Sequence, residues 1–206
     1  MVLNYKKLNK ETYNKIARSL DKNYEKLGAR ASDIKRAFGY MQKKNPNVLE
    51  LGCGTGRDAK EILKRTNRYL GVDISESMLD IARRKVPRGK FKVKDISGFM
   101  LPSNLDMVFA FASLFHLNHA ELKSIFKKIY HSLNHGGIFY ISISQRPKPV
   151  YRTYSQTEFG RRYYFFHSPS QIKKLAKMNK FVEVWYDNQP RLISGSNWFT
   201  LVFQKN

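Results

Sequence analysis

The sequence is poor in features that cross-link a chain or anchor it in a membrane. Cys53 is its only cysteine, which excludes an internal disulfide and a zinc site built from several cysteines. It has no run of about 18 apolar residues and no apolar segment typical of a signal peptide at its start. It also has no carboxylate cluster suited to a metal ion. We therefore expect a cytoplasmic protein without a bound metal.

Acidic residues are scarce compared with basic ones. Sixteen Asp and Glu oppose 38 Lys and Arg, which gives a formal net charge of +22 at pH 7. Basic residues are concentrated in residues 83–94 and 146–162. Such an excess attracts anions and speeds association with polyanions, but it also occurs on surfaces that are merely well solvated. The charge alone leaves both interpretations open.

Helical and strand-like patterns alternate along most of the chain. Apolar residues recur at helical spacing within residues 11–44, and Pro46 breaks this pattern. Strands are expected at residues 47–51, 68–72, 91–94, 107–112 and 138–144, with helices at 57–65, after Ser75, and at 118–133. Gly136 and Gly137 are expected to end the last of these helices. This alternation predicts an α/β protein with a doubly wound parallel sheet.

The pattern changes after the fifth expected strand. Ser168 and Gln171 form a capping box with Pro169 at the first helical position, which predicts a helix to about residue 177. Two strands follow at residues 181–186 and 198–203 without a helical pattern between them, so they predict a hairpin and an antiparallel last strand. We expect a single domain, in which residues 1–46 form a helical flank or lid and residues 47–206 form the catalytic domain.

The most informative segment is a glycine-rich loop after the first expected strand. Glu50 is followed by Gly52, Gly54 and Gly56 at alternate positions, and the next strand ends in Asp73. Glycines in such a loop let the backbone approach a ligand closely. An acidic residue about 20 positions later is placed to accept hydrogen bonds from a ribose. The loop and Asp73 together predict a site for a nucleoside cofactor.

These residues and the segments after them resemble the class I S-adenosylmethionine-dependent methyltransferases. The first motif is Glu50-Leu51-Gly52-Cys53-Gly54-Thr55-Gly56, in contrast to the G-x-G-x-x-G spacing of dinucleotide-binding folds. The resemblance covers residues 11–204 and continues, in the family's order, through Gly71–Ser75, Met78–Arg83, Asp95-Ile96, Leu105–Val108, Ala112–Leu117 and Leu133–Ser142. It implies the methyltransferase fold, a Rossmann-like doubly wound sheet of about seven strands with an antiparallel last strand.

The resemblance also implies a cofactor, S-adenosylmethionine, with S-adenosylhomocysteine as the product. Glu50 and the backbone of residues 52–56, which includes Cys53, would line the methionine half, and Asp73 would bind the ribose. The remaining cofactor residues are implied at Ile74 and Met78 against the adenine, Asp95 and Ile96 at its amino group, Phe111 and Ala112 near the methionine end, and Tyr13 closing over the site. Asp95 is alternatively a cap for Ser97-Gly98, and Met78 a core residue.

His116 is the conspicuous candidate for a catalytic base. It follows the fourth expected strand on the reactive edge of the sheet, and neutral histidine suits proton removal near pH 7. The segment Leu114–Leu117 also resembles a family segment in which the histidine only positions the backbone. Both roles remain open for this residue.

The segment of residues 145–167 is expected to overhang the same edge and to bind the acceptor. It combines arginines, which clamp carboxylates or phosphates, with tyrosines, which stack on bases or shape apolar pockets. The candidate acceptor-binding residues are Arg146, Tyr151, Arg152, Arg161, Arg162 and Tyr163. We therefore expect a small, anionic metabolite as the acceptor.

Three alternatives compete with this prediction. The basic charge and interleaved tyrosines would also suit an RNA methyltransferase. The same fold could serve a non-catalytic protein that binds S-adenosylmethionine. A nicotinamide-dependent oxidoreductase is disfavoured by the glycine spacing and by the terminal hairpin. The sequence leaves the acceptor atom and the oligomeric state undetermined.

Overall fold

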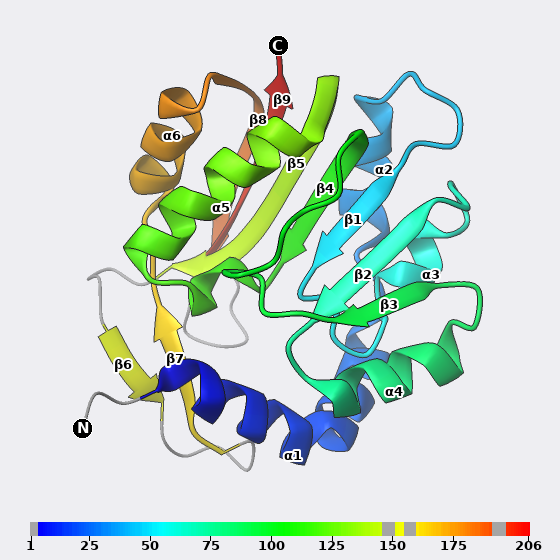
Figure 1. Cartoon of the computed structure of the whole chain (residues 1–206), viewed down its shortest axis with the longest axis vertical. Helices are drawn as coiled ribbons and strands as arrows, with labels where there is room; N and C mark the ends of the chain where they lie inside the picture. Colours follow the sequence, from blue (N-terminus) through cyan, green and yellow to red (C-terminus); the bar gives the residue numbers. More distant parts are fainter. Residues whose placement is uncertain (1–3, 146–150, 155–159, 191–196) are drawn as a thin grey trace.

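The protein folds around one mixed β-sheet with helices on both faces (Figure 1). The computed structural model describes residues 4–145, 151–154, 160–190 and 197–206. Within these residues the main sheet has seven strands in the order β3-β2-β1-β4-β5-β9-β8. The strands are β1 (Val48–Leu51), β2 (Tyr69–Asp73), β3 (Lys90–Val93), β4 (Leu105–Phe111), β5 (Leu133–Gln145), β8 (Phe181–Pro190) and β9 (Asn197–Lys205).

The sheet confirms the expected α/β class and the reversed last strand. β1 pairs in parallel with β2 and β4, and β5 extends the parallel set from β4. β9 runs antiparallel to both β5 and β8, so the last strand of the chain is inserted between them. The hairpin predicted from the short segment between the last two strands is therefore present.

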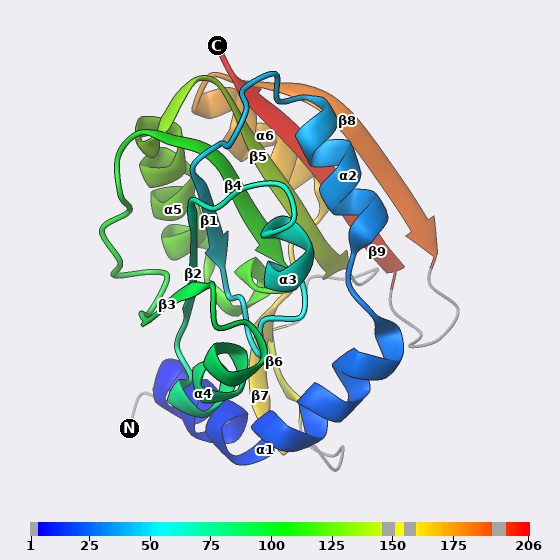
Figure 2. The same cartoon turned by 90° about the vertical axis from the view of Figure 1, so that its right-hand side faces the viewer.

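Helices cover the two faces of the sheet and create two apolar cores (Figures 1 and 2). On one face, α5 and α6 bury Leu122, Phe126 and Ile172 against the sheet. On the other face, α2 and α3 bury Ile34 and Ile62. The helices are α1 (Tyr5–Leu27), α2 (Ala31–Gly39), α3 (Ala59–Ile62), α4 (Glu76–Lys85), α5 (His119–Ser132) and α6 (Pro169–Met178), and a 3-10 turn, η1, spans Leu114–His116.

Local capping follows the sequence where side chains provide it. The Ser75 hydroxyl accepts a hydrogen bond from the Met78 amide at the start of α4, and Ser168 and Gln171 form the expected capping box at the start of α6. The helix expected at residues 57–65 is only the short α3. The pattern expected over residues 11–44 is divided into α1 and α2, because Gly28 ends α1 with a φ of 67°.

The predicted role of Gly136 and Gly137 was wrong. The helix α5 ends at Ser132, and Leu133 already has an extended backbone. β5 begins there rather than at residue 138, and Gly136, with a φ of 74°, lies inside the strand. The structure also contains a hairpin that the sequence did not predict, formed by β6 (Tyr151–Tyr154) and β7 (Arg162–Phe165).

The helix α1 lies across the carboxyl end of the parallel strands (Figure 2). Its apolar side buries Ile16 and Leu20 against Met78 and Ile81 of α4. β7 packs along the same helix, where Thr12 donates a hydrogen bond to the Arg161 carbonyl. This helix and β7 therefore enclose the edge of the sheet at which ligands of such folds bind. None of the helices in the described residues is long and apolar enough to cross a membrane.

Candidate functional site

A pocket of about 990 Å³, including the solvent in its mouth, lies between α1 and the carboxyl ends of β1, β2 and β4. Its walls join the glycine loop, the strand ends and the N-terminal helix. The lining residues are Lys6, Asn9, Tyr13, Tyr24, Arg30, Glu50, Gly52, Cys53, Gly54, Arg57, Asp58, Asp73, Ile74, Met78, Asp95, Ile96, Phe111, Ala112, Ser113, His116 and Leu117. Every predicted cofactor residue except Gly56 is in this set.

The glycine loop is held against β2 by its own amides. The amides of Gly52 and Cys53 donate to the Val72 carbonyl at 2.8 and 3.0 Å, and the Gly54 amide donates to Asp73 Oδ2 at 3.0 Å. Gly52 has a φ of 75°, and a Cβ there would lie 2.4 Å from Cβ of Ser113. Gly54 has a φ of 54°, and a Cβ there would meet only Tyr24 Cε2, at 4.0 Å. The loop therefore leaves room for a ligand beside its backbone.

Gly56 has a different position from the other two glycines. It is absent from the pocket lining and packs against α4, where a Cβ would lie 3.2 Å from that of Ala82. Its φ of 77° belongs to the region that favours glycine. In this structure Gly56 shapes the loop from behind the pocket.

Asp73 ends β2 with its carboxylate fixed by backbone amides. The Ser75 amide donates to Oδ1 at 2.9 Å, and the Gly54 amide donates to Oδ2. Burial raises the pKa of Asp73, while these amide hydrogen bonds act in the opposite direction. Asp73 lines the pocket. The lone pairs of its carboxylate that the amides do not use can accept hydrogen bonds from a pair of hydroxyl groups.

Glu50 is a buried carboxyl group at the end of β1. Burial, followed by repulsion from Asp58, raises the pKa of Glu50 to about 8, although the Tyr69 hydroxyl donates a hydrogen bond to it. Asp58 is paired with Arg30 at 2.7 Å and with Arg57 at 2.8 Å. Glu50 has no such cationic partner within the described residues, so a positively charged ligand group would stabilise its ionised form.

Asp95 is a cap and also lines the pocket. Its Oδ1 accepts from the Ser97 amide at 2.9 Å, as expected of a cap, and its side chain also lines the pocket. Although burial opposes the shift, hydrogen bonds from Ser97 and the Lys6 ammonium lower the pKa of Asp95. Lys6 lies 3.2 Å from its Oδ2. Ile74, Met78 and Ile96 provide apolar walls beside it.

His116 is fixed through both ring nitrogens. Its Nδ1 lies 2.7 Å from the Tyr163 carbonyl oxygen, and its Nε2 lies 2.8 Å from the Tyr13 hydroxyl. Burial lowers the pKa of His116 to about 4, so the imidazole is neutral at pH 7. The predicted base is therefore placed in the pocket wall, but its accepting nitrogen faces Tyr13 rather than open space.

The predicted acceptor-binding residues are only partly described. Arg146 lies outside the described residues, and for Tyr151 and Arg152 only the backbone of β6 is described. Arg161 is exposed, whereas Arg162 is half-buried with its guanidinium 5.5 Å from the Tyr13 ring centre. Arg161, Arg162 and Tyr163 lie beside the pocket rather than in its lining.

Several lining residues were missed by the sequence analysis, and three of them come from α1. The missed residues are Lys6, Asn9, Tyr24, Arg30, Arg57, Asp58, Ser113 and Leu117. A buried carboxylate such as Asp58 requires a cationic partner, but the sequence does not indicate that Arg30 provides it. No local pattern marks Lys6 or Asn9, since their place depends on how α1 crosses the sheet.

The donor set suits a nucleoside bearing a positively charged amino-acid tail. Asp73 matches a ribose, the apolar residues beside Asp95 match an adenine, and the carboxyl group of Glu50 matches a cationic group. At Gly54 the loop has no side chain, and the nearest atom to a Cβ placed there would be Tyr24 Cε2, at 4.0 Å. The residues present therefore fit S-adenosylmethionine.

Comparisons with known proteins agree with this chemistry. Residues 48–137 match the family described as "Methyltransferase domain". The malonyl-[acyl-carrier protein] O-methyltransferase 1 of Ilyobacter polytropus is 25% identical over 98% of this chain and 74% of its own length. For two further curated relatives the chain spans only about half of their length, 51% and 56%.

Solved structures share the fold at lower identity. The magnesium protoporphyrin IX methyltransferase of Synechocystis PCC 6803, with bound S-adenosylhomocysteine, has a TM-score of 0.76 and 14% identity, covering 98% of this chain and all of that chain. The 1,6-didemethyltoxoflavin-N1-methyltransferase of Burkholderia thailandensis has a TM-score of 0.72 and 18% identity, covering 100% and 92%.

Proposed function

We propose that this chain, a class I S-adenosylmethionine-dependent methyltransferase, methylates a small, anionic metabolite. The observation that carries the proposal is the enclosure of the reactive edge by α1 and β7. Asn9, Tyr13 and His116 form one wall of the pocket beside the end of β4. An acceptor must fit between this wall and the strand ends, which favours a small molecule over a folded nucleic acid.

The cofactor residues are proposed to act as the resemblance implies. S-adenosylmethionine, when bound, supplies a methyl group already activated on a positively charged sulfur. Asp73 accepts hydrogen bonds from the ribose hydroxyls, and Asp95 accepts from the adenine amino group. Glu50 holds the positive charge of the methionine half, beside the loop amides. These residues orient the cofactor, and orientation supplies much of the catalysis in such a transfer.

The anionic character of the acceptor is inferred from the basic groups around the pocket. Arg30 lines it, and Arg162 lies above Tyr13. The Nε atoms of both arginines are buried without a hydrogen-bond partner among the described residues. The relative from Ilyobacter polytropus acts, by its name, on malonyl-[acyl-carrier protein], an acyl group carried by a protein, so its acceptor differs in class from the one proposed for this chain.

The proposal is tested by following the methyl group. The protein is incubated with radiolabelled-methyl S-adenosylmethionine and an extract of its native host, which is then separated into small-molecule, protein and RNA fractions. We expect label in the small-molecule fraction. Label that ribonuclease releases from the RNA fraction would make the basic surface a nucleic-acid site. Absence of transfer, with the cofactor still bound, would favour the non-catalytic alternative.

Substitution of the arginines tests the anionic acceptor. Arg162→Ala should raise the amount of extract needed for half-maximal transfer, because it removes a guanidinium beside the pocket. Arg161→Ala is expected to act in the same direction but less strongly, since Arg161 is exposed. Affinity for S-adenosylhomocysteine should remain unchanged in both variants. If both variants needed the same amount of extract as the wild type for half-maximal transfer, the arginines would not bind the acceptor.

A further inference from the structure

Tyr13 and His116 form a hydroxyl–imidazole pair in the wall of the pocket. Tyr13 comes from α1, and His116 ends η1, which follows β4. The Tyr13 hydroxyl oxygen lies 2.8 Å from His116 Nε2. Both residues line the same pocket as Phe111 and Ala112, at the end of β4. The pair therefore lies beside the part of the pocket that the resemblance assigns to the methionine end.

The surroundings of His116 determine which nitrogen carries its hydrogen. His116 Nδ1 lies 2.7 Å from the Tyr163 carbonyl oxygen and 3.3 Å from Asn9 Nδ2. A carbonyl oxygen only accepts hydrogen bonds and is the nearer partner, so we assign the hydrogen to Nδ1. Asn9 Nδ2 donates to the same carbonyl at 3.1 Å. His116 Nε2 is then an acceptor, and the Tyr13 hydroxyl donates its hydrogen to it.

This arrangement fixes what Tyr13 offers to the pocket. Because its own hydrogen is directed to His116, the hydroxyl oxygen presents only lone pairs to other partners. The Arg162 guanidinium lies over the Tyr13 ring, 5.5 Å from the ring centre. Tyr13 lines the pocket, so the lone pairs of its hydroxyl oxygen can accept a hydrogen bond from a ligand there. This position attracts a hydrogen-bond donor and repels the oxygen of a carboxylate.

Resting on the proposed methyltransferase function, we propose that Tyr13 is a catalytic residue that binds the hydrogen of the acceptor's nucleophilic atom. The acceptor is therefore methylated on a hydroxyl or an N–H group, not on a carboxylate. Its negative charge lies elsewhere in the molecule. His116 acts through Tyr13 and is a positioning residue.

The proton and the electrons can be followed through the transfer. The acceptor atom forms a bond to the methyl carbon with its lone pair, and the carbon–sulfur bond breaks with its electron pair remaining on sulfur. The hydrogen of the acceptor passes to the Tyr13 oxygen as the Tyr13 proton moves to His116 Nε2. The positive charge lost from sulfur thus reappears on the imidazole, which releases the proton to solvent after the product leaves.

The fate of the transferred label tests the acceptor class. Label from radiolabelled-methyl S-adenosylmethionine is collected in the small-molecule fraction of the host extract and treated with mild alkali. Methyl esters of carboxylates release volatile methanol, whereas methyl ethers and methylamines do not. We expect the label to remain involatile. Volatile label would overturn this inference alone, whereas no transfer by the wild-type protein would overturn the proposed function on which it rests.

Two variants test the roles of the pair. Tyr13→Phe should lower the maximal rate about 100-fold, the size typical of a lost acid–base group, with the dissociation constant of S-adenosylhomocysteine changed less than about twofold. In His116→Gln the glutamine carbonyl can still accept the hydrogen bond from Tyr13, so the amount of extract needed for half-maximal transfer should stay the same. The maximal rate should fall, because an amide does not take up the proton.

The matched control is Tyr186→Phe, on the exposed surface of β8. It should leave rate, half-saturation and cofactor affinity unchanged. A Tyr13→Phe rate like that of this control would overturn the assignment of Tyr13. Equal losses of rate and of S-adenosylhomocysteine affinity in Tyr13→Phe would show that Tyr13 holds the cofactor instead.

Discussion

At the scale of single residues, Glu50 is the group whose charge depends most directly on a bound ligand. Its pKa is raised to about 8 because it is buried and faces Asp58. A cationic ligand beside it favours the carboxylate, so binding at pH 7 should expel a proton. Calorimetric titrations in buffers of different ionisation enthalpy should show this release for S-adenosylmethionine, and less of it for S-adenosylhomocysteine, which lacks the sulfonium charge.

The control for this prediction is Glu50→Gln, which should abolish the release. The raised pKa of Glu50 also determines how the free energy of unfolding changes with pH. A carboxyl whose pKa is raised on folding contributes stability at low pH that is lost as the pH rises from the unfolded value of 4.5 through about 8. Without ligand, the free energy of unfolding of Glu50→Gln should therefore fall less than that of the wild type as the pH rises from 4.5 to about 8. Equal proton release by both proteins would contradict the account of Glu50.

Cys53 is expected to act through its size. It lies in the glycine loop, is buried, and has a thiol whose pKa is raised by burial and by the nearby Glu50, so it is a poor nucleophile. Cys53→Ala should fold, retain most of the methyl transfer and keep its cofactor affinity, as measured with the labelled extract. Complete loss of transfer by the folded variant would assign the thiol a chemical role.

The residues that the sequence predicted are those marked by local motifs. Glu50, Gly52, Gly54 and Asp73 follow buried strands directly, so the strand pattern alone brings them to one edge. Lys6, Asn9 and Arg30 belong to segments with no motif, and they reach the pocket only because α1 and α2 pack across the sheet. Their contribution is a property of tertiary packing, which a local pattern does not specify.

At the scale of elements, the contact between α1 and β7 closes the pocket. Asn9 is buried, and its side chain forms the two hydrogen bonds that a neighbouring strand would form with Tyr163. Its Oδ1 accepts from the Tyr163 amide at 2.6 Å, and its Nδ2 donates to the Tyr163 carbonyl. Asn9→Ala leaves both backbone groups without this partner. It should lower the free energy of unfolding by about 1–3 kcal/mol and speed hydrogen exchange at the Tyr163 amide.

Asn23→Ala, on the same helix and outside this contact, is the comparison for that measurement. It should leave the exchange rate at Tyr163 unchanged, because no hydrogen bond of Asn23 to β7 is found in the described part of the chain. If both variants exchanged equally fast at Tyr163, the side chain of Asn9 would not be what ties β7 to the helix. Urea denaturation of the two proteins gives the accompanying change in stability.

Most elements of the main sheet could be predicted, whereas the β6–β7 hairpin could not. β4 is apolar from Met107 to Phe111, and β5 is buried over residues 137–144, because helices cover both faces of these strands. β7 is half-buried and mixes arginine with aromatic residues, so it lacks a clear alternation. The start of β5 was predicted at residue 138 instead of Leu133 for a local reason. Gly136 and Gly137 form a pattern that is typical of the end of a helix.

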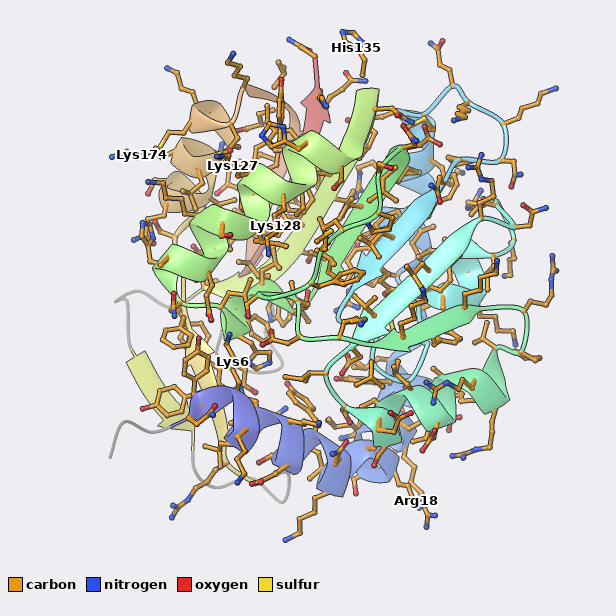
Figure 3. All side chains as sticks on the ribbon, in the orientation of Figure 1. Lys6, Arg18, Lys127, Lys128, His135 and Lys174 are labelled. Carbon is orange, nitrogen blue, oxygen red and sulfur yellow. The ribbon has the colours of Figure 1, made fainter. Side chains whose placement is uncertain are left out.

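At the scale of the whole molecule, the distribution of charge separates the pocket from the surface. Four of the 16 acidic residues line the pocket, namely Glu50, Asp58, Asp73 and Asp95. Basic side chains dominate outside it. Figure 3 shows Lys127 and Lys174 pointing outward from α5 and α6, and Arg18 pointing away from α1, whereas Lys6 faces the sheet. Lys6, Arg30 and Arg57 also line the pocket, so its charges nearly balance within a molecule that is otherwise strongly basic and attracts anions.

The most direct test of the account is a calorimetric titration of the protein with S-adenosylhomocysteine. We predict binding at one site, weakened about tenfold or more by Asp73→Asn, because hydrogen bonds to a charged group contribute about 1.5–3 kcal/mol. Asp80→Asn, on the exposed side of α4, should bind like the wild type. No binding by the wild-type protein, or equal affinities for all three proteins, would contradict the assignment of this pocket.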